Sequence, residues 1–438
     1  MRGGGAVGLY SASHRLRFYN KMRDDGRLQY LKDKKNMKLS ADRQRGTTRA
    51  PLTLGGVRPL ELMQGVCAWR QSDEILNQIH AWHLNWMCEH TGHVFREIYR
   101  QDAKAGYWLY GCFETLPDWA TSRFLLAPET CHRVRINGPD EYTPDKHIQD
   151  KHIKFFITTL LAERRLSGDA ESGQRCWTAL GDNYFAGSRM VDPRSEPWDA
   201  KADFVAPRIG SVVPVDFASP YSQFINSMAS CPFEPYTPAE ASALWAGLEE
   251  AFMRVTFVSA AAALLFTRFV KVIVPRKNPL KPHYKGSSST PSHIGRLLLR
   301  NGHLMDVSEM AESLVHESIH ALLDAVETSE PFAEHANPAD EPLVRSPWSG
   351  RELPRRIYLH ACFVWYGLAK FWRAATQSDA FPQEAVSKRL SQALCGFRHS
   401  NLVDNLAPHL KAIPKKTLEA IESLRGELES SGDLNWEP

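Results

Sequence analysis

Three absences limit the kind of protein that this 438-residue sequence encodes. The opening segment MRGGGAVGLY has no apolar stretch after its one Arg, so we expect no secretory signal peptide. The most apolar run, residues 258–266, is far shorter than the roughly 20 residues that a membrane helix needs. The eight cysteines include no Cys-x-x-Cys pair, which favours free thiols in a reducing cytoplasm. We therefore expect a cytoplasmic protein with no membrane segment.

The net charge is small, but the charged residues are unevenly distributed. The net charge of +3 gives no general reason to expect nucleic acid as a partner. Residues 1–50, however, contain thirteen Lys or Arg against four Asp. This composition predicts a basic, disordered tail over residues 1–52, with an arm that attracts an acidic partner as the alternative. Asp24, Asp25 and Asp33 argue against a transit peptide.

The pattern of apolar residues and helix starts divides the rest of the chain. Residues 60–99 and 145–166 are predicted helices, and residues 53–236 form a mainly helical N-terminal region with one predicted strand at 209–217. Thr237 and Glu240 form a capping box that begins a helix reaching about residue 256. Strands are predicted at 268–275 and 294–302, joined by a loop at 276–293, before a second capping box at Asp306 and Glu309. Residues 237–438 are the predicted metal-binding catalytic core.

The helix that begins at Asp306 contains the segment VHESIHALLD. His316 and His320 are four residues apart, so both imidazoles lie on one helix face and can bind one divalent ion, while Glu317 is placed as a general base. The alternative is a pair of ordinary half-buried histidines. Asp324 lies on the same face and could orient an imidazole, although a solvated helix end is an equal alternative for Asp324 and the preferred interpretation of Glu327.

A metal held by His316 and His320 needs a third ligand. The extended His-x-x-Gly-x-x-His pattern is absent, which argues against the metzincin type. A strongly apolar helix is predicted over residues 356–374, and we favour its His360 as the third ligand over an ordinary core histidine. The downstream candidates are Glu330, Glu334, His335, Glu341, Glu352 and His360.

Several segments between residues 209 and 372 together resemble one family. They are GSVVPVD followed by SPYS, then GSSSTPSHIGRLLL, LVHESIHALLD, SPW at 346–348, and LHACFVWYGLAKFW at 359–372. In order and spacing they resemble the HExxH-type 2-oxoglutarate-dependent peptide β-hydroxylases, which are associated with modification of ribosomally made peptides. The resemblance does not extend to the basic tail or to the C-terminus.

The resemblance implies an Fe(II) centre bound by His316, His320 and His360, with 2-oxoglutarate as cosubstrate and hydroxylation at the β-carbon of a peptide side chain. The role of Glu317 is then less defined than in a peptidase. A bidentate Arg would bind the distal carboxylate of 2-oxoglutarate. The candidates are Arg351, Arg355 and Arg356, although the family tends to have Arg directly after the Trp where this chain has Ser349 and Gly350. A solvated loop is the alternative for all three arginines.

The sequence thus predicts an α+β fold in which a mainly helical N-terminal region precedes a zincin-like core with a small sheet and the metal-binding HExxH helix. Its expected partners are a precursor peptide and a separate leader-binding protein, with no specific nucleic acid and no membrane. The first alternative function is a zinc-dependent metallopeptidase that uses Glu317 as general base. The second is a peptide-binding protein with a structural metal.

Overall fold

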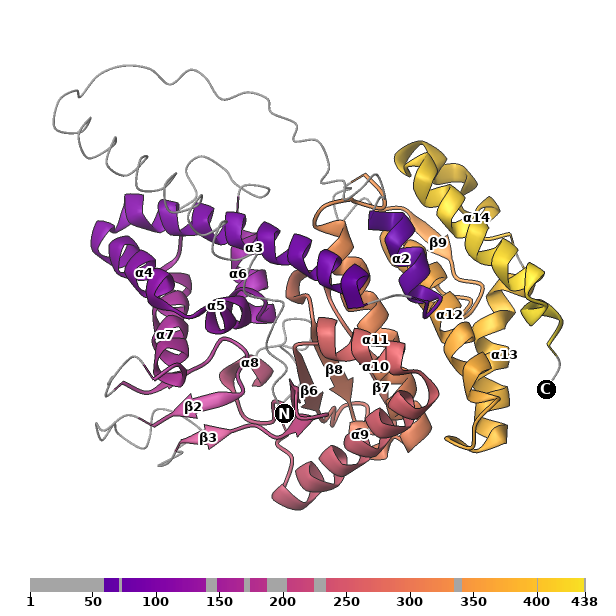
Figure 1. Ribbon diagram of the computed structural model, residues 1–438, viewed down its shortest axis with the longest axis horizontal. Helices are drawn as coiled ribbons and strands as arrows, with labels where there is room; N and C mark the ends of the chain where they lie inside the picture. Colours follow the sequence, from indigo (N-terminus) through magenta and orange to yellow (C-terminus); the bar gives the residue numbers. More distant parts are fainter. Residues whose placement is uncertain are drawn as a thin grey trace.

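The computed structural model describes residues 59–70, 73–138, 148–168, 174–186, 203–223, 234–334, 341–399 and 401–436. The tail predicted for residues 1–52 lies outside these ranges. Within them helices predominate and the strands are short, which confirms the coarse prediction of a mostly helical α+β chain (Figure 1). The α-helices are α2 (Pro59–Cys67), α3 (Asp73–Gln101), α4 (Ala103–Thr115), α5 (Asp118–Leu125), α6 (Pro128–Asn137), α7 (Asp150–Leu166), α8 (Pro220–Gln223), α9 (Pro238–Val258), α10 (Ala260–Phe269), α11 (Val307–Glu327), α12 (Arg355–Ala375), α13 (Gln383–His399) and α14 (Lys415–Ser430).

Helices α3 to α7 form one end of the molecule (Figure 1). Their packing is dominated by aromatic side chains that meet edge to face, a favourable geometry for aromatic quadrupoles. Phe95 of α3 has its ring centroid 5.9 Å from that of Phe113 in α4 and 5.5 Å from that of Phe156 in α7. The predicted helix over 60–99 is two helices, because α2 ends at Cys67 and α3 begins at Asp73.

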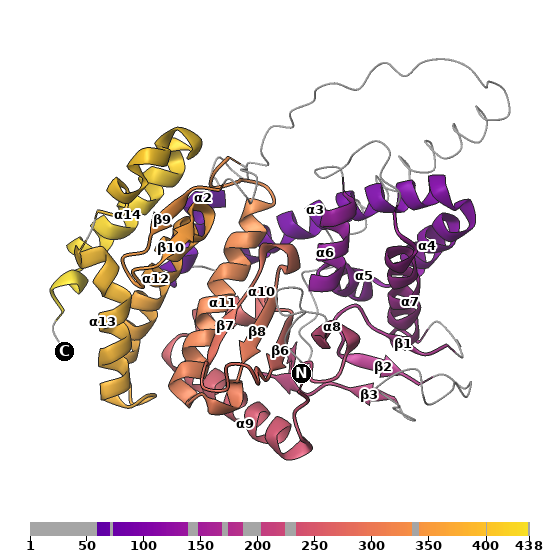
Figure 2. The same cartoon turned by 180° about the vertical axis from the view of Figure 1, so that it is seen from behind.

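Helix α2 lies with the C-terminal helices, although the sequence grouped it with the N-terminal region. It packs against α11, α12 and α14. Gln64 donates a hydrogen bond to the carbonyl of Ala420 at 3.1 Å, and the Trp69 indole donates to the carbonyl of Gly367 at 2.9 Å. Figure 2 shows α2 beside α12 and α14, at the end of the molecule opposite α4 and α7.

A three-stranded sheet supports the centre of the molecule. Its strands are β6 (Val272–Arg276), β7 (Gly286–Ser288) and β8 (Arg296–Arg300), in the order β6-β8-β7. β6 and β8 are parallel, whereas β7 is the antiparallel edge strand. Leu297 and Leu299 belong to the core that includes α9, α10 and α11, but Leu298 packs in a separate small cluster with two residues of β6. The two faces of this sheet therefore have different environments.

The remaining described strands are β1 (Cys176–Trp177), β2 (Asn183–Phe185), β3 (Phe204–Val205), β4 (Arg208–Ile209), β5 (Val213–Pro214), β9 (Leu343–Arg345) and β10 (Glu352–Pro354). They form a three-stranded antiparallel sheet in the order β1-β2-β3 and two antiparallel pairs, β4-β5 and β9-β10. The single strand predicted at 209–217 is wrong. Gly210 and Ser211 both have positive φ, 55° and 60°, and turn the chain back between β4 and β5. The predicted loop at 276–293 also contains β7, whose Gly-Ser-Ser sequence gives no strand signal.

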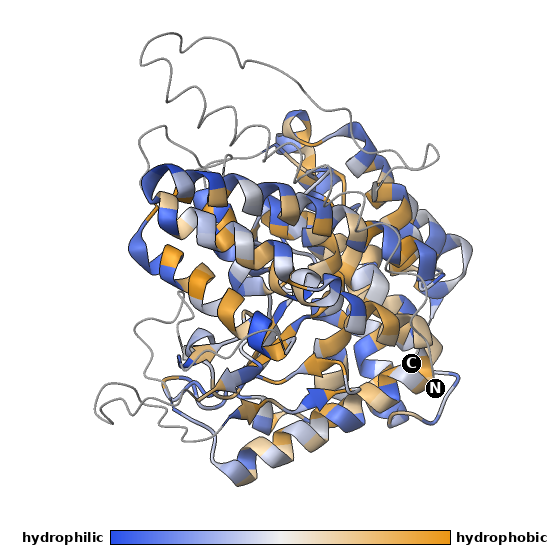
Figure 3. Cartoon of the chain, turned by 60° about the vertical axis from the view of Figure 1, so that its left-hand side comes forward, coloured by the Kyte–Doolittle hydropathy of each residue, from blue (hydrophilic) through white to orange (hydrophobic). Residues whose placement is uncertain are grey.

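Helices α11 and α12 pack against each other at the centre of the chain's main core. Both predicted capping boxes are present: Thr237 with Glu240 at the start of α9, and Asp306 with Glu309 at the start of α11. Figure 3 shows apolar residues concentrated where the helices meet in the middle of the molecule. Among the described helices, none combines the length and the apolar character that crossing a bilayer requires.

Candidate metal centre

Helix α11 places the two histidines of the HExxH segment side by side. The imidazole centroids of His316 and His320 are 5.0 Å apart, as expected for neighbours one turn apart on a helix. The opposite face of α11 is apolar and buried in the core. The His316 side chain is 28% exposed, so the site is accessible from the His316 end.

Helix α12 brings His360 to the same place. Its Nδ1 lies 3.3 Å from Nδ1 of His320, and the two rings lie at 25° to each other. Only 1% of His360 is exposed, and Phe332 packs against its ring. The three predicted ligands thus form a row, His316–His320–His360, across the contact between α11 and α12.

The spacing of the two Nδ1 atoms fits a shared ion. Two imidazole nitrogens bound to one ion at about 2.1 Å lie roughly 3.0–3.4 Å apart, depending on whether the geometry is octahedral or tetrahedral. Burial holds the pKa of His320 well below its usual value, and His316, His360 and Arg356 lower it further. A neutral imidazole is the form that binds a metal. His320 and His360 therefore fit a shared metal ion as they stand, whereas one ligand atom from each of the three histidines does not lie within 4.8 Å of the other two, so His316 would have to turn toward the pair to join them.

A carboxylate fixes the orientation of His360. Oε2 of Glu327 lies 3.0 Å from Nε2 of His360, on the side of the ring away from His320. Only 9% of the Glu327 side chain is exposed, so the preferred interpretation of Glu327 as a solvated helix end is wrong. With Nε2 protonated and bonded to Glu327, Nδ1 is left as the free ligand atom. In the sequence, Glu327 lies seven residues after His320 and so on the same face of the helix, and this spacing was the feature that pointed to its role.

Arg356 holds that carboxylate in turn. Its guanidinium is ion-paired with both Glu327 and Asp324. The pKa of Glu327 falls to about 2: burial opposes this shift, but the charge and hydrogen bond of His360 and the charge of Arg356 outweigh it. Asp324, which the sequence assigned to an imidazole, is buried and bonded to Arg356 instead. Asp324 therefore acts on His360 only through Arg356 and Glu327.

Asp324, Glu327 and His360 also bring three potential ligand atoms within 4.8 Å of one another. A cation at this cluster would have to displace the guanidinium of Arg356, which already neutralises both carboxylates. Among the described residues, no ion pair places a cationic side chain between His316 and His320. The histidine row is therefore the site that a cation can enter without displacing an existing one.

Glu317 is oriented by the edge strand β7. The Ser287 hydroxyl donates a hydrogen bond of 2.7 Å to Oε1 of Glu317, which is 1% exposed. The same Oε1 lies 4.0 Å from Nε2 of His316. Oε2 is buried and has no hydrogen-bond partner among the described residues. Glu317 thus presents an uncommitted acceptor beside the outermost histidine. No sequence pattern indicated Ser287.

The three candidate arginines are placed differently. Arg356 stands beside His360 but is bound to two carboxylates. Arg355 is buried and donates to the carbonyl of Glu334 at 2.8 Å, away from the histidines, and Arg351 is exposed. Arg355 and Arg356 are thus already engaged, and no described contact joins Arg351 to the histidine row, so the three do not fit as a clamp for 2-oxoglutarate in this arrangement.

The other candidate ligands lie apart from the row. Glu330 is ion-paired with Lys416, and Glu341 accepts a hydrogen bond from the backbone N–H of Arg356 at 3.0 Å. Glu334 and Glu352 are exposed. His335 lies outside the described residues.

An aromatic wall flanks the accessible end of the row. The ring of Trp365 in α12 meets that of His316 edge-on, with centroids 6.2 Å apart. Trp348 stacks on Trp365 at 5.9 Å and 12°, and its indole N–H donates to the carbonyl of Ala393 in α13. A substrate that approaches His316 would contact the half-buried Trp365.

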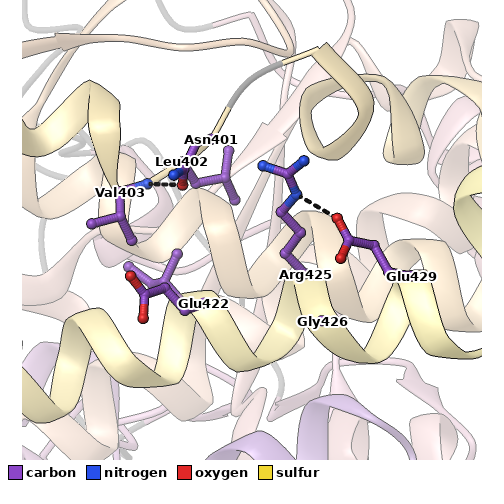
Figure 4. Close-up of a pocket in the computed structure, with 8 residues that line it drawn as sticks. Asn401, Leu402, Val403, Glu422, Arg425, Gly426 and Glu429 are labelled. Carbon is purple, nitrogen blue, oxygen red and sulfur yellow. Dashed lines mark hydrogen bonds and ion pairs between the residues drawn. The ribbon is translucent and has the colours of Figure 1, made fainter.

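A shallow cleft of about 280 Å³ lies elsewhere, between α14 and residues 401–403 (Figure 4). Leu402 and Ile421 line it, with Arg425 bonded to Glu429 at its rim. None of the candidate ligands borders this cleft, so it is not part of the metal centre.

Comparison with known proteins adds no assignment: no family model matches this chain, and no curated protein matches it.

Proposed function

We propose that this chain is an Fe(II)- and 2-oxoglutarate-dependent hydroxylase that acts on the β-carbon of a peptide side chain. The observation that carries the proposal is the pairing of His320 with His360 at 3.3 Å, with Glu327 on the far nitrogen of His360. A third histidine in this position, with no carboxylate among the described residues directly opposite the HExxH pair, favours the hydroxylase over a peptidase. The proposal includes a zincin-like arrangement of the β6-β8-β7 sheet and α11.

In this proposal His316, His320 and His360 hold the iron. When bound, iron with 2-oxoglutarate and O₂ supplies the oxidising power to replace a C–H bond by C–OH. The chain's own contribution is to fix the imidazoles through Glu327 and Arg356, and to keep the inner side of the site dry through Phe332 and the buried face of α12. His316, with Trp365 beside it, is the side from which the peptide enters. We assign no residue to 2-oxoglutarate.

A zinc-dependent peptidase is the second candidate, and one observation favours it. The buried Oε2 of Glu317 has no partner among the described residues, and Oε1 is 4.0 Å from His316. A carboxylate in this place could take a proton from a water molecule beside the outermost ligand.

The first experiment adds Fe(II) and then 2-oxoglutarate to the metal-free protein under anaerobic conditions and records the visible spectrum. A weak charge-transfer band that is lost in His316→Ala supports the hydroxylase, provided that it is kept in the control His409→Ala, a histidine of the 3₁₀-helix Asp404–Ala412 outside the row. No band, with tight Zn(II) binding and cleavage of a peptide library that Glu317→Gln abolishes, supports the peptidase. Tight metal binding with neither band nor cleavage indicates a structural metal.

A further inference from the structure

Arg296, the first residue of β8, is a buried cation with no ion-pair partner in the part of the chain that the structure describes. Only 8% of its surface is exposed. No hydrogen bond or ion pair joins its guanidinium to any residue that the structure describes. Buried arginines are normally paired, because an isolated charge in a low-dielectric interior is costly. Burial lowers the pKa of Arg296, and the charges of Glu129 and Asp216 offset this effect only in part.

This arginine lies on the side of the sheet away from the histidines. Side chains alternate along a strand, so Arg296 shares a face with Leu298, opposite to Leu297 and Leu299. Leu297 and Leu299 pack in the core that contains α11, whereas Leu298 packs with Val272 and Val274. The site around Arg296 is therefore distinct from the metal centre and does not depend on the function proposed for it.

The nearby carboxylates are already engaged. Glu129 of α6 accepts a hydrogen bond from Arg133 at 2.8 Å, and its other oxygen lies 3.4 Å from Nε2 of His293. Asp216 accepts three hydrogen bonds, from the Ser219 hydroxyl and from the N–H groups of Ala218 and Ser219. Neither carboxylate is within ion-pair distance of Arg296, so the guanidinium keeps its full capacity to donate.

A second orphaned group lies in the same region. His132 stacks on His293 with centroids 4.2 Å apart and rings at 14°. Nδ1 of His132 is buried and has no hydrogen-bond partner among the described residues. Burial and the charges of its neighbours, Arg296 among them, lower the pKa of His132 to about 4. The neutral imidazole can donate from Nδ1, so Arg296 and His132 together offer unused donors.

We propose that Arg296 binds the carboxylate of a small organic acid, with His132 as a second donor. The site lies on the face of the β6-β8-β7 sheet that is directed away from the histidine row. A guanidinium presents a planar fork that matches a carboxylate with two parallel hydrogen bonds. A phosphate carries up to two charges at neutral pH and would be repelled more strongly by Glu129 and Asp216. The site therefore selects a singly charged carboxylate group.

Isothermal titration and thermal unfolding of the full chain test the proposal, with acetate, propionate and phosphate as probes. The titrations contain 1,10-phenanthroline, a chelator without carboxylate groups, so that binding at the metal centre cannot account for the signal. The matched variants are Arg296→Met and Arg300→Met, because Arg300 projects from the same face of β8 at its other end. We expect the carboxylates to raise the Tm of the wild type and of Arg300→Met. Arg296→Met should bind them at least tenfold more weakly, while its Tm in carboxylate-free buffer stays equal to or above that of the wild type.

Arg296→Lys provides a second variant that keeps the charge and removes the fork. It should fold as the wild type does, by circular dichroism, and bind the carboxylates more weakly than the wild type but more tightly than Arg296→Met. Equal binding by the wild type and Arg296→Met, or no binding of any probe, would overturn the proposal and leave Arg296 solvated by buried water. Binding of phosphate without binding of the carboxylates would overturn the ligand class.

Discussion

Glu327 and His360 lie 33 positions apart in the sequence, yet their side chains meet at 3.0 Å. This contact decides which nitrogen of His360 faces His320. Because Nε2 is directed at the carboxylate, Nδ1 is the atom 3.3 Å from the neighbouring imidazole. The contact between α11 and α12 thus orients a candidate ligand before any metal binds.

Replacing Glu327 by Gln should weaken metal binding without abolishing it. The amide keeps a hydrogen-bond acceptor for His360 but removes the negative charge that makes the imidazole a better ligand. Changes of this kind typically reduce metal affinity by about 10–100-fold. Competition with a chromophoric chelator for Fe(II) or Zn(II) measures the effect, with the exposed Glu334→Gln as control. An unchanged affinity in Glu327→Gln would remove the orienting role from Glu327.

Replacing Arg356 by Gln should destabilise the protein. Asp324 and Glu327 would then be left in a mostly buried place without their shared cation. Breaking such a pair costs about 3–5 kcal/mol when it is fully buried, and we expect about 2 kcal/mol here because the Arg356 side chain is 23% exposed. Urea unfolding measures the loss. The double variant Arg356→Gln/Asp324→Asn should recover part of it, and a double variant no more stable than the single one would contradict this account.

The elements of the metal centre that follow local rules could be predicted from the sequence. The Asp306 capping box and the four-residue spacing of His316 and His320 depend on one helix only, and apolar periodicity indicated the α12 helix that carries His360. The missed features depend on contacts between distant segments. β7 becomes a strand only because β8 offers it hydrogen bonds, and Ser287 is significant only because β7 lies against α11. Strand composition likewise could not reveal the turn at Gly210 and Ser211.

Asp216 should give the protein a specific dependence of stability on pH. Burial raises the pKa of this carboxyl from its ordinary value of 3.8 to about 6, although the hydrogen bonds from Ser219 and Ala218 oppose the shift. Between about pH 4 and pH 6 the folded state then binds more protons than the unfolded state. The free energy of unfolding should therefore fall as pH rises through this window, by roughly 2–3 kcal/mol from this group.

The variant Asp216→Asn isolates that contribution, because every other titrating group is the same in both proteins. We expect the difference in unfolding free energy between wild type and Asp216→Asn to change across pH 4–6 and to be constant above about pH 7. The exposed Asp379→Asn serves as control and should show no such change. A difference for Asp216→Asn that stays constant with pH would contradict a raised pKa.

A single methyl group at Gly396 should disturb the aromatic wall beside His316. A Cβ at this position of α13 would lie 2.3 Å from Cε2 of Trp348, and the rigid indole is held by its hydrogen bond to the carbonyl of Ala393. Gly396→Ala must therefore shift Trp348, and with it the stacked Trp365. Overpacking of this kind costs about 1–3 kcal/mol, so we expect a lower Tm and a changed tryptophan fluorescence spectrum.

Gly426→Ala is the matched control, because Gly426 also lies within a helix and a Cβ there meets nothing within 4 Å. That variant should gain about 0.5–1 kcal/mol from the better helix propensity of Ala and keep the wild-type fluorescence. If Gly396→Ala behaved like Gly426→Ala, Trp348 would be free to move, and the wall could not position a substrate at His316.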